Sequence, residues 1–180
     1  MKIIYFHVPN LQDYMIPTKK WLDEMSQHYD IIDVTTPPNE NRMYEGLVEN
    51  WNVDDLVICG QDNVGSLEML YEYEKCGYDV CSNPCLMYEK STGRGGIVQN
   101  MISTDDNSRF MHPKDSTLKF CNGVVGTGLS RISKRLQSKI DITGEPFHFQ
   151  NFDHTLSKLF NKAGVNLFHL HYPIHTHMKK

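Results

Sequence analysis

The chain lacks long hydrophobic runs and carries little excess of either charge. None of its apolar stretches approaches the ~18–20 residues of a membrane-spanning helix, so we expect no membrane span. The formal net charge is -4 at pH 7, and the clearest basic stretch is SRISKRLQSK (130–139). This balance argues against a protein whose main task is to bind nucleic acid, and we interpret the basic stretch as a solvated surface.

The sequence shows neither a recognisable signal peptide nor the many paired cysteines of a secreted protein. The start MKIIYFHVPN is apolar over too few residues for a signal peptide, so a cytoplasmic protein is expected. The five cysteines are an odd number in a chain long enough to form a core without crosslinks, which favours reduced thiols. Cys76, Cys81 and Cys85 do not have a standard zinc-binding spacing, and we interpret them as buried apolar thiols.

What is present is the composition of an ordinary folded protein, with 39% hydrophobic and 11% aromatic residues among 180. In the first half, short apolar strands alternate with segments whose hydrophobic residues recur at helical spacing. This alternation predicts an α/β fold with a mixed, mostly parallel central sheet and helices on both faces. The expected strands are KIIYFHVP, YDIIDVTTPP and VDDLVICGQDN, and the expected helices are YMIPTKKWLDEMSQHY, NENRMYEGLVENW and VGSLEMLYEYEKCG.

The second half is less regular. Residues 89–117 are rich in Gly, Ser, Asp and Asn, and we expect long loops there with short strands such as GGIVQNMI. The segment FQNFDHTLSKLFNKAG carries an amphipathic stripe and predicts a helix, and VNLFHLHYP predicts a final strand. Because no internal repeat or linker interrupts the chain, a single domain over residues 1–180 is expected.

Ligands of open α/β sheets bind at the carboxyl ends of the strands. Asp62 is the most informative residue at such a position, because a carboxylate directly after a buried strand can bind a hard cation that in turn binds phosphate oxygens. The alternative is that Asp62 caps the helix expected to start near Gly65. The candidate residues selected in this way are His7, Pro9, Thr35, Asp62 and Asn63.

A glycine-rich loop, NGVVGTG (122–128), precedes a segment expected to be helical, ISKRLQ. Its spacing matches neither a P-loop nor a dinucleotide-binding fingerprint. We therefore interpret Gly123, Gly126 and Gly128 as positions where the backbone closely approaches a neighbouring group.

Four of the nine histidines fall within HLHYPIHTH. His169 and His171 alternate with apolar residues and should share one face of the final strand, as structural residues or lining a cleft. His175 and His177 repeat this spacing, and two imidazoles so placed can reach one metal ion together with a carboxylate from elsewhere in the chain. A purely structural role is the alternative for all four.

The order of these motifs resembles the nucleotide-sugar-dependent glycosyltransferases of the GT-A fold, in a shortened form like small proteins of some viruses and phages. In that family a strand ends in an Asp-x-Asp motif; ICGQDN stands in this place, with Asp62 as the second Asp and Gly60 instead of the first. NGVVGTGLSRISKRL loosely matches the family's glycine-rich segment and basic helix. FQNFDHTLSKLFNKAGVNLFHLHYPIHTH matches its acidic motif, helix, strand and closing histidine.

The resemblance implies a GT-A-like, Rossmann-related domain, with residues 1–88 as the nucleotide-binding half and residues 118–180 as the half that binds the acceptor and closes the metal site. It implies Mn²⁺ or Mg²⁺ as cofactor, a UDP- or GDP-linked sugar as donor, and a glycan, a protein or a small molecule as acceptor. A homodimer is compatible with this function. Asp153 would be the catalytic base, and Asp62 with His175 or His177 would bind the metal. The candidate donor contacts are His7, Pro9, Thr35, Asp62, Asn63, Gly126 and Gly128.

Two other functions fit the same residues. The chain has Gly60 in place of the first Asp and Asn151-Phe152 in place of the Glu that precedes the catalytic Asp, which allows a catalytically silent relative that binds a sugar or a partner. His-x-His pairs also serve metal-dependent hydrolases, although the second carboxylate that such a site needs has no obvious place in this sequence.

Overall fold

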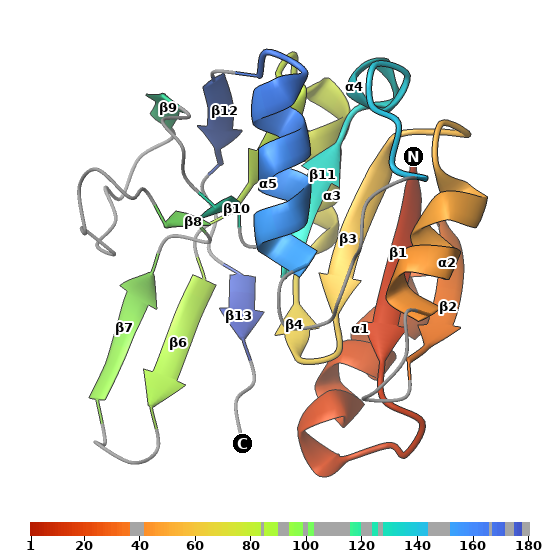
Figure 1. Ribbon diagram of the computed structural model, residues 1–180. Coiled ribbons are helices and arrows are strands. Elements are labelled where there is room, and N and C mark those ends of the chain that lie inside the picture. The colour runs from red at the N-terminus through yellow and green to blue at the C-terminus, as the bar shows by residue number, and fades with distance from the viewer. Residues whose placement is uncertain are drawn as a thin grey trace.

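The computed structural model describes residues 1–36, 42–83, 85–89, 94–98, 101–102, 116–119, 124–125, 128–143, 152–165, 167–171 and 175–177. Over these ranges the chain folds into a large central sheet with helices on both faces and a smaller sheet beside it (Figure 1). None of the helices in these ranges is long and apolar enough to cross a membrane.

The first half alternates strands and helices as the sequence predicts. Strand β1 lies between β2 and β3 and is parallel to both, so the three carboxyl ends meet at one edge of the sheet. The elements are β1 (Lys2–His7), the short η1 (Asp13–Met15), α1 (Ile16–Met25), β2 (Asp30–Thr35), α2 (Arg42–Asn50), β3 (Leu56–Gly60) and α3 (Leu67–Lys75).

The second half completes the sheet, whose strand order is β2-β1-β3-β11-β5-β12-β9. Strands β11 and β9 run opposite to the other five, so the predicted mixed, mostly parallel sheet is confirmed. The added elements are β5 (Val80–Ser82), β9 (Ser116–Lys119), β11 (Leu129–Ile132), α4 (Lys134–Gln137), α5 (Phe152–Lys162) and β12 (Leu167–Leu170).

A four-stranded sheet, in the order β4-β13-β6-β7, lies beside the main sheet. Its strands come from four separate segments, of which the sequence predicts only a short strand in GGIVQNMI. That segment contains most of β7 and all of β8, and β8 pairs with β10. The elements are β4 (Asn63–Val64), β6 (Cys85–Glu89), β7 (Arg94–Val98), β8 (Met101–Ile102), β10 (Val124–Val125) and β13 (His175–His177).

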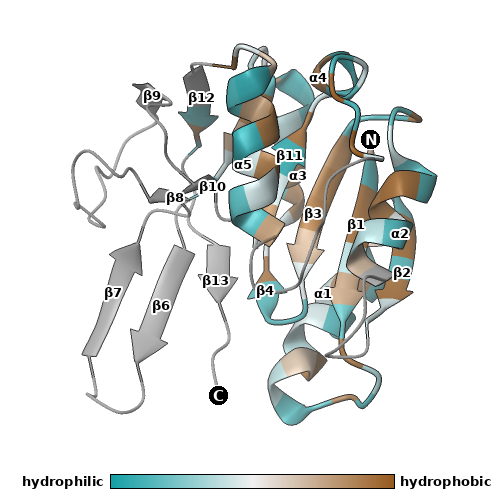
Figure 2. Ribbon diagram, viewed as in Figure 1, coloured by the Kyte–Doolittle hydropathy of each residue, from teal (hydrophilic) through white to brown (hydrophobic). Residues whose placement is uncertain are grey.

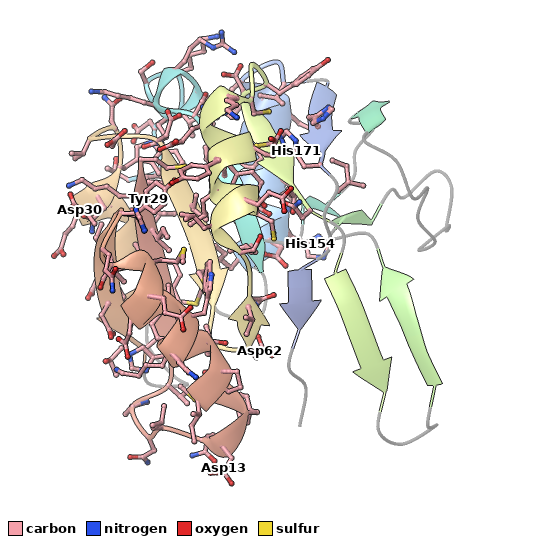
Figure 3. The ribbon with its side chains drawn as sticks, turned by 180° about the vertical axis from the view of Figure 1, so that it is seen from behind. Asp13, Tyr29, Asp30, Asp62, His154 and His171 are labelled. Carbon is pink, nitrogen blue, oxygen red and sulfur yellow. The ribbon has the colours of Figure 1, made fainter. Side chains whose placement is uncertain are left out.

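The core consists of two hydrophobic clusters, one on each face of the main sheet. Successive strand residues point to opposite faces, so Ile4 packs with residues of α2, α4 and α5, whereas Ile3 packs with residues of α1 and α3. Figure 2 shows the hydrophobic colour along β3 and a mixture of both colours on the helices. Figure 3, from behind, shows α1 and α3 covering one face, and helices on both faces are thereby confirmed.

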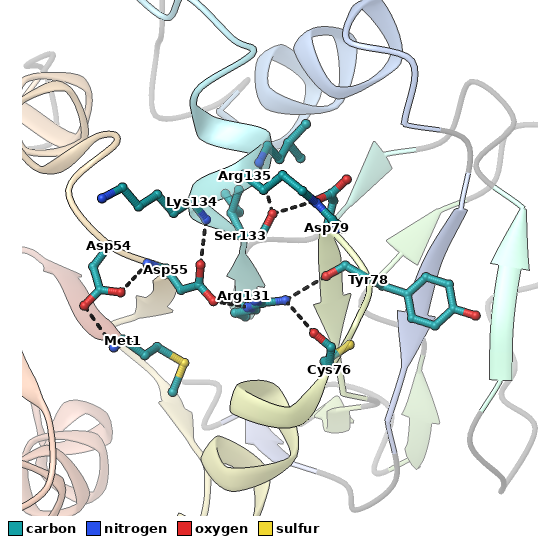
Figure 4. Close-up of polar contacts among 12 residues, drawn as sticks. Met1, Asp54, Asp55, Cys76, Tyr78, Asp79, Arg131, Ser133, Lys134 and Arg135 are labelled. Atoms are coloured by element: carbon teal, nitrogen blue, oxygen red, sulfur yellow. Dashed lines mark hydrogen bonds and ion pairs between the residues drawn. The ribbon is translucent and has the colours of Figure 1, made fainter.

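The segment 129–137 differs from its prediction. Instead of a helix through ISKRLQ, residues 129–132 form the buried strand β11 between β3 and β5, and α4 is a single turn. Arg131, expected on a solvated surface, has a side chain only 7% exposed. Its charge is matched by Asp55, which accepts hydrogen bonds from Nε at 3.1 Å and from Nη2 (Figure 4). Ion pairing and burial of the whole strand thus outweigh the preference of arginine for solvent.

Arg131→Met is expected to lower the free energy of unfolding by about 3 kcal/mol, because it leaves the partly buried Asp55 without its ion-pair partner. It also removes the hydrogen bonds from Nη1 to the carbonyl oxygens of Cys76 and Tyr78, at 3.3 and 2.7 Å. Arg135→Met is the matched control. Its side chain is 63% exposed and pairs with Asp79, and such surface pairs contribute about 0–1 kcal/mol. Urea unfolding of both variants measures the difference, and equal losses would contradict a buried role for Arg131.

Candidate active site

Asp62 lies at the carboxyl end of β3, in the two-residue turn that leads into β4. Its Oδ1 accepts a hydrogen bond from Nδ2 of Asn63 at 3.1 Å. Helix α3 begins farther along the chain, where Oγ of Ser66 accepts a hydrogen bond from the backbone N–H of Met69 at 3.3 Å. The interpretation of Asp62 as the cap of this helix is therefore wrong, because Ser66 takes that position.

Two glycines enclose the side chain of Asn63, which is 3% exposed. The backbone N–H of Gly60 donates to the carbonyl oxygen of Gly128 at 2.8 Å. A Cβ atom on Gly60 would lie 2.8 Å from Nδ2 of Asn63, and one on Gly128 would lie 2.9 Å from its Oδ1. Gly128 is thus a position of close approach, as predicted, and the packing of Asn63 gives a physical reason for the glycine at the first position of the motif. Gly126 lies outside the described residues.

Gly60→Asp, which restores the Asp-x-Asp pattern, is expected to lower the free energy of unfolding by about 1–3 kcal/mol, since the buried Asn63 has to move. Gly77→Asp is the control, because nothing lies within 4 Å of the Cβ position at Gly77. The comparison needs only urea unfolding of the two variants and the parent. If Gly60→Asp were as stable as the control, Asn63 would not determine the residue at position 60.

His7 and Thr35 meet at the ends of adjacent strands. Nε2 of His7 lies 2.5 Å from Oδ1 of Asp33 and 3.3 Å from Oγ1 of Thr35. The His7 ring also stacks on Tyr5, with centroids 4.8 Å apart. These contacts fix the orientation of the imidazole, and Pro9 follows as an exposed residue.

A second set of polar contacts links the β1 end to the Asp62 turn. The backbone N–H of Val8 donates to Oε1 of Gln61 at 3.1 Å, and Nε2 of Gln61 donates to the hydroxyl of Tyr14 at the same distance. Burial, followed by the negative charge of Asp62, raises the pKa of Tyr14. The hydroxyl therefore stays protonated, and the carboxylate is close enough to act on it electrostatically.

Asp153 lies in the first turn of α5. The preceding residue, Phe152, is buried and packs edge-on against Phe6 near the carboxyl end of β1, with ring centroids 5.9 Å apart. This contact places the start of α5 at the same edge of the sheet as Asp62. A carboxylate here also gains from the helix dipole, which suits the predicted helix-terminus charge, and the role of Asp153 as catalytic base stays a prediction.

Strand β13 brings the end of the chain to this edge. It runs antiparallel to β4, with His177 opposite Asn63 and Thr176 opposite Val64. The backbone that carries His175 and His177 is therefore next to the Asp62 turn. Their side chains lie outside the described residues, so the assignment of either histidine as a metal ligand stays a prediction.

His169 and His171 share one face, as predicted, with ring centroids 4.4 Å apart. They belong to a different place from Asp62, as Figure 3 shows for His171. The ligand atoms of Cys76, Cys81 and His171 all lie within 4.8 Å of one another. Sequence reasoning missed this cluster, because its two cysteines have no standard metal-binding spacing and the histidine comes from a distant strand.

Known protein structures with a similar fold identify the fold class. No protein family matches the sequence, and no curated protein matches it either. A197 from STIV matches with a TM-score of 0.54 and 14% identity, over 94% of this chain and 81% of that one. A glycosyltransferase involved in the glycosylation of the major capsid of PBCV-1 matches with a TM-score of 0.50 and 11% identity, over 99% and 93% of the two chains. The chain therefore has a GT-A-like α/β fold, as predicted.

Proposed function

We propose that this protein is a metal-dependent glycosyltransferase that moves a sugar from a UDP- or GDP-linked donor to an acceptor. The observation that carries the proposal is the pairing of β13 with β4, which brings the strand of His175 and His177 beside the turn of Asp62 and Asn63. The likeness of fold to the PBCV-1 glycosyltransferase supports the same conclusion.

The residues at this edge fit a divalent cation. Asp62 offers carboxylate oxygens, and one histidine of β13 would add an imidazole nitrogen, a donor set that suits Mn²⁺. Gly60 offers no side-chain ligand, so the remaining positions would be filled by diphosphate oxygens and water. The chemistry that such an ion supplies when bound is neutralisation of the charge that develops on the diphosphate leaving group.

Three elements of the chain would then act on the donor and acceptor. Asp153, at the start of α5, would accept the proton of the attacking acceptor hydroxyl. The backbone at Gly128, held against Gly60 by their 2.8 Å hydrogen bond, and the enclosed Asn63 would fix the turn that carries Asp62. His7 and Thr35, whose side chains lie 3.3 Å apart at the ends of β1 and β2, would line the nucleotide side of the site.

A second candidate function is a catalytically silent relative that binds nucleotide or glycan. The observation that favours it is the packing of Asn63 against Gly60, since Asn63 would have to move to admit the first carboxylate of the motif.

Release of nucleotide from a sugar donor distinguishes the enzyme from the silent relative. The protein is incubated with a panel of UDP- and GDP-linked sugars and Mn²⁺, and release of UDP or GDP is measured with and without candidate glycan acceptors. Release that requires Mn²⁺ supports the enzyme. Nucleotide binding without release from any donor would favour the silent relative, and absence of both binding and release would overturn both functions.

A further inference from the structure

The cluster formed by Cys76, Cys81 and His171 lies outside the candidate active site. Cys76 follows the last turn of α3, Cys81 is in β5, and His171 directly follows β12. His171 donates its backbone N–H to the carbonyl oxygen of Ser82 at 2.8 Å, which holds the end of β12 against β5. Three separate elements therefore meet at one point.

The histidine side chain is buried with no nitrogen or oxygen partner for its ring. His171 is 5% exposed, and in the described part of the chain the polar group that acts on its ring nitrogens is the thiol of Cys76. A buried polar group without a partner costs about 1–3 kcal/mol, so such a group calls for an explanation. One of its ring nitrogens lies within 4.8 Å of the two sulfur atoms, and Figure 3 shows His171 beside α3.

We propose that Cys76, Cys81 and His171 form a Zn²⁺ site that fastens the end of α3 to β5 and β12. Two thiolates and one imidazole are soft and borderline ligands of the kind that select zinc. In a tetrahedral zinc site the ligand atoms lie roughly 3.5–3.8 Å apart, so the observed cluster needs side-chain movements of only about 1 Å. These three residues leave the fourth position of a tetrahedral site for water.

The groups of this cluster are close enough to change the pKa of both thiols. The hydrogen bond between the two thiols lowers the pKa of Cys76 to about 4, although burial opposes this shift. A hydrogen bond with His171 also lowers the pKa of Cys76. Burial, and then the neighbouring Cys76, raises the pKa of Cys81 well above its ordinary value. Zn²⁺ binds thiolates, so metal binding to this cluster would release the remaining thiol protons.

One positive charge lies beside the cluster. The Arg131 guanidinium interacts with Cys81 and forms an ion pair with Asp55. It also donates to the carbonyl oxygens of Cys76 and Tyr78. The Tyr73 hydroxyl donates to the carbonyl oxygen of Leu129 and so is already paired. The chain continues from β5 toward β6 and from β12 toward β13, so zinc at this point would stabilise the junction that precedes these two strands of the smaller sheet.

The test uses the full chain without a histidine tag. Zinc content is measured after purification and after chelation, and Co²⁺ is then added, because Co²⁺ with thiolate ligands gives an intense charge-transfer absorption. We expect one Zn²⁺ per chain, a lower melting temperature after chelation, and the Co²⁺–thiolate band. Cys76→Ala and His171→Gln are each expected to weaken Zn²⁺ binding by more than roughly 100-fold, beyond the loss typical for a residue that only supports a ligand.

Two control variants distinguish this site from others. Cys59→Ala removes a thiol that is also fully buried but lies outside the cluster, and it should keep the zinc and the Co²⁺–thiolate band. His177→Gln should keep both as well, which separates this site from the candidate active site. Because Cys76 is partly exposed, its alanine variant should fold even if Cys81→Ala does not. Unchanged zinc binding in Cys76→Ala, or a metal-free protein with a Cys76–Cys81 disulfide, would overturn the proposal.

Discussion

Asp62→Asn is expected to weaken the metal-dependent binding of UDP or GDP by at least roughly 100-fold, because it removes the only charged ligand that we assign to the cation. The substitution keeps the oxygen that accepts the 3.1 Å hydrogen bond from Asn63, so the turn should keep its structure. The measurement is the increase in melting temperature caused by nucleotide plus Mn²⁺, compared with nucleotide alone.

Asp30→Asn is the matched control for that experiment. It removes the same charge from an exposed position at the start of β2, at the opposite edge of the sheet from Asp62 (Figure 3). The control should bind nucleotide and Mn²⁺ as the parent does. A full response to Mn²⁺ in Asp62→Asn would show that the cation is bound elsewhere.

Asp153→Asn is expected to lower kcat by roughly 10²–10⁴-fold, the range typical of a lost general base, while nucleotide binding stays unchanged. Asparagine has nearly the shape of aspartate but cannot accept the acceptor's proton. The measurement is the rate of UDP or GDP release with a saturating donor and acceptor, together with the binding of the nucleotide alone.

Glu68→Gln controls for the effect of charge at a helix terminus. Glu68 is an exposed acidic residue in the first turn of α3, as Asp153 is an acidic residue in the first turn of α5. Both substitutions should cost about 0.3–1 kcal/mol of stability through the helix dipole. If kcat fell equally in both variants, or in neither, Asp153 would be a helix-terminus charge and not the base.

Much of the fold follows from local pattern. The strands of the first half are apolar runs bounded by polar residues and prolines, and helical spacing identifies α1, α2, α3 and α5. Each of these signals is contained within one short segment, because the buried face of a strand or helix is set by its own period. The carboxyl edge of the sheet, and Asp62 on it, follow from that topology without further information.

The rest depends on contacts between distant segments. The sequence does not predict β11, because Arg131 resembles a residue of the solvated surface. Its ion pair with Asp55 and its hydrogen bonds to the carbonyl oxygens of Cys76 and Tyr78 allow this strand to be buried. β4 and β13 have two and three residues, too few to show a period, and each is stabilised by its partner. The cluster of Cys76, Cys81 and His171 forms because β12 pairs with β5. The spacing of these residues in the sequence does not predict that pairing.

The central claim is that this protein binds a nucleoside diphosphate through a divalent cation at the Asp62 turn, and isothermal titration calorimetry with UDP and with GDP tests it most directly. Each nucleotide is titrated into the full chain with Mn²⁺ and, separately, after removal of divalent metal. The account predicts binding of at least one of them that requires Mn²⁺ and is lost in Asp62→Asn. Binding of neither nucleotide with Mn²⁺, or equal binding without it, would contradict the account.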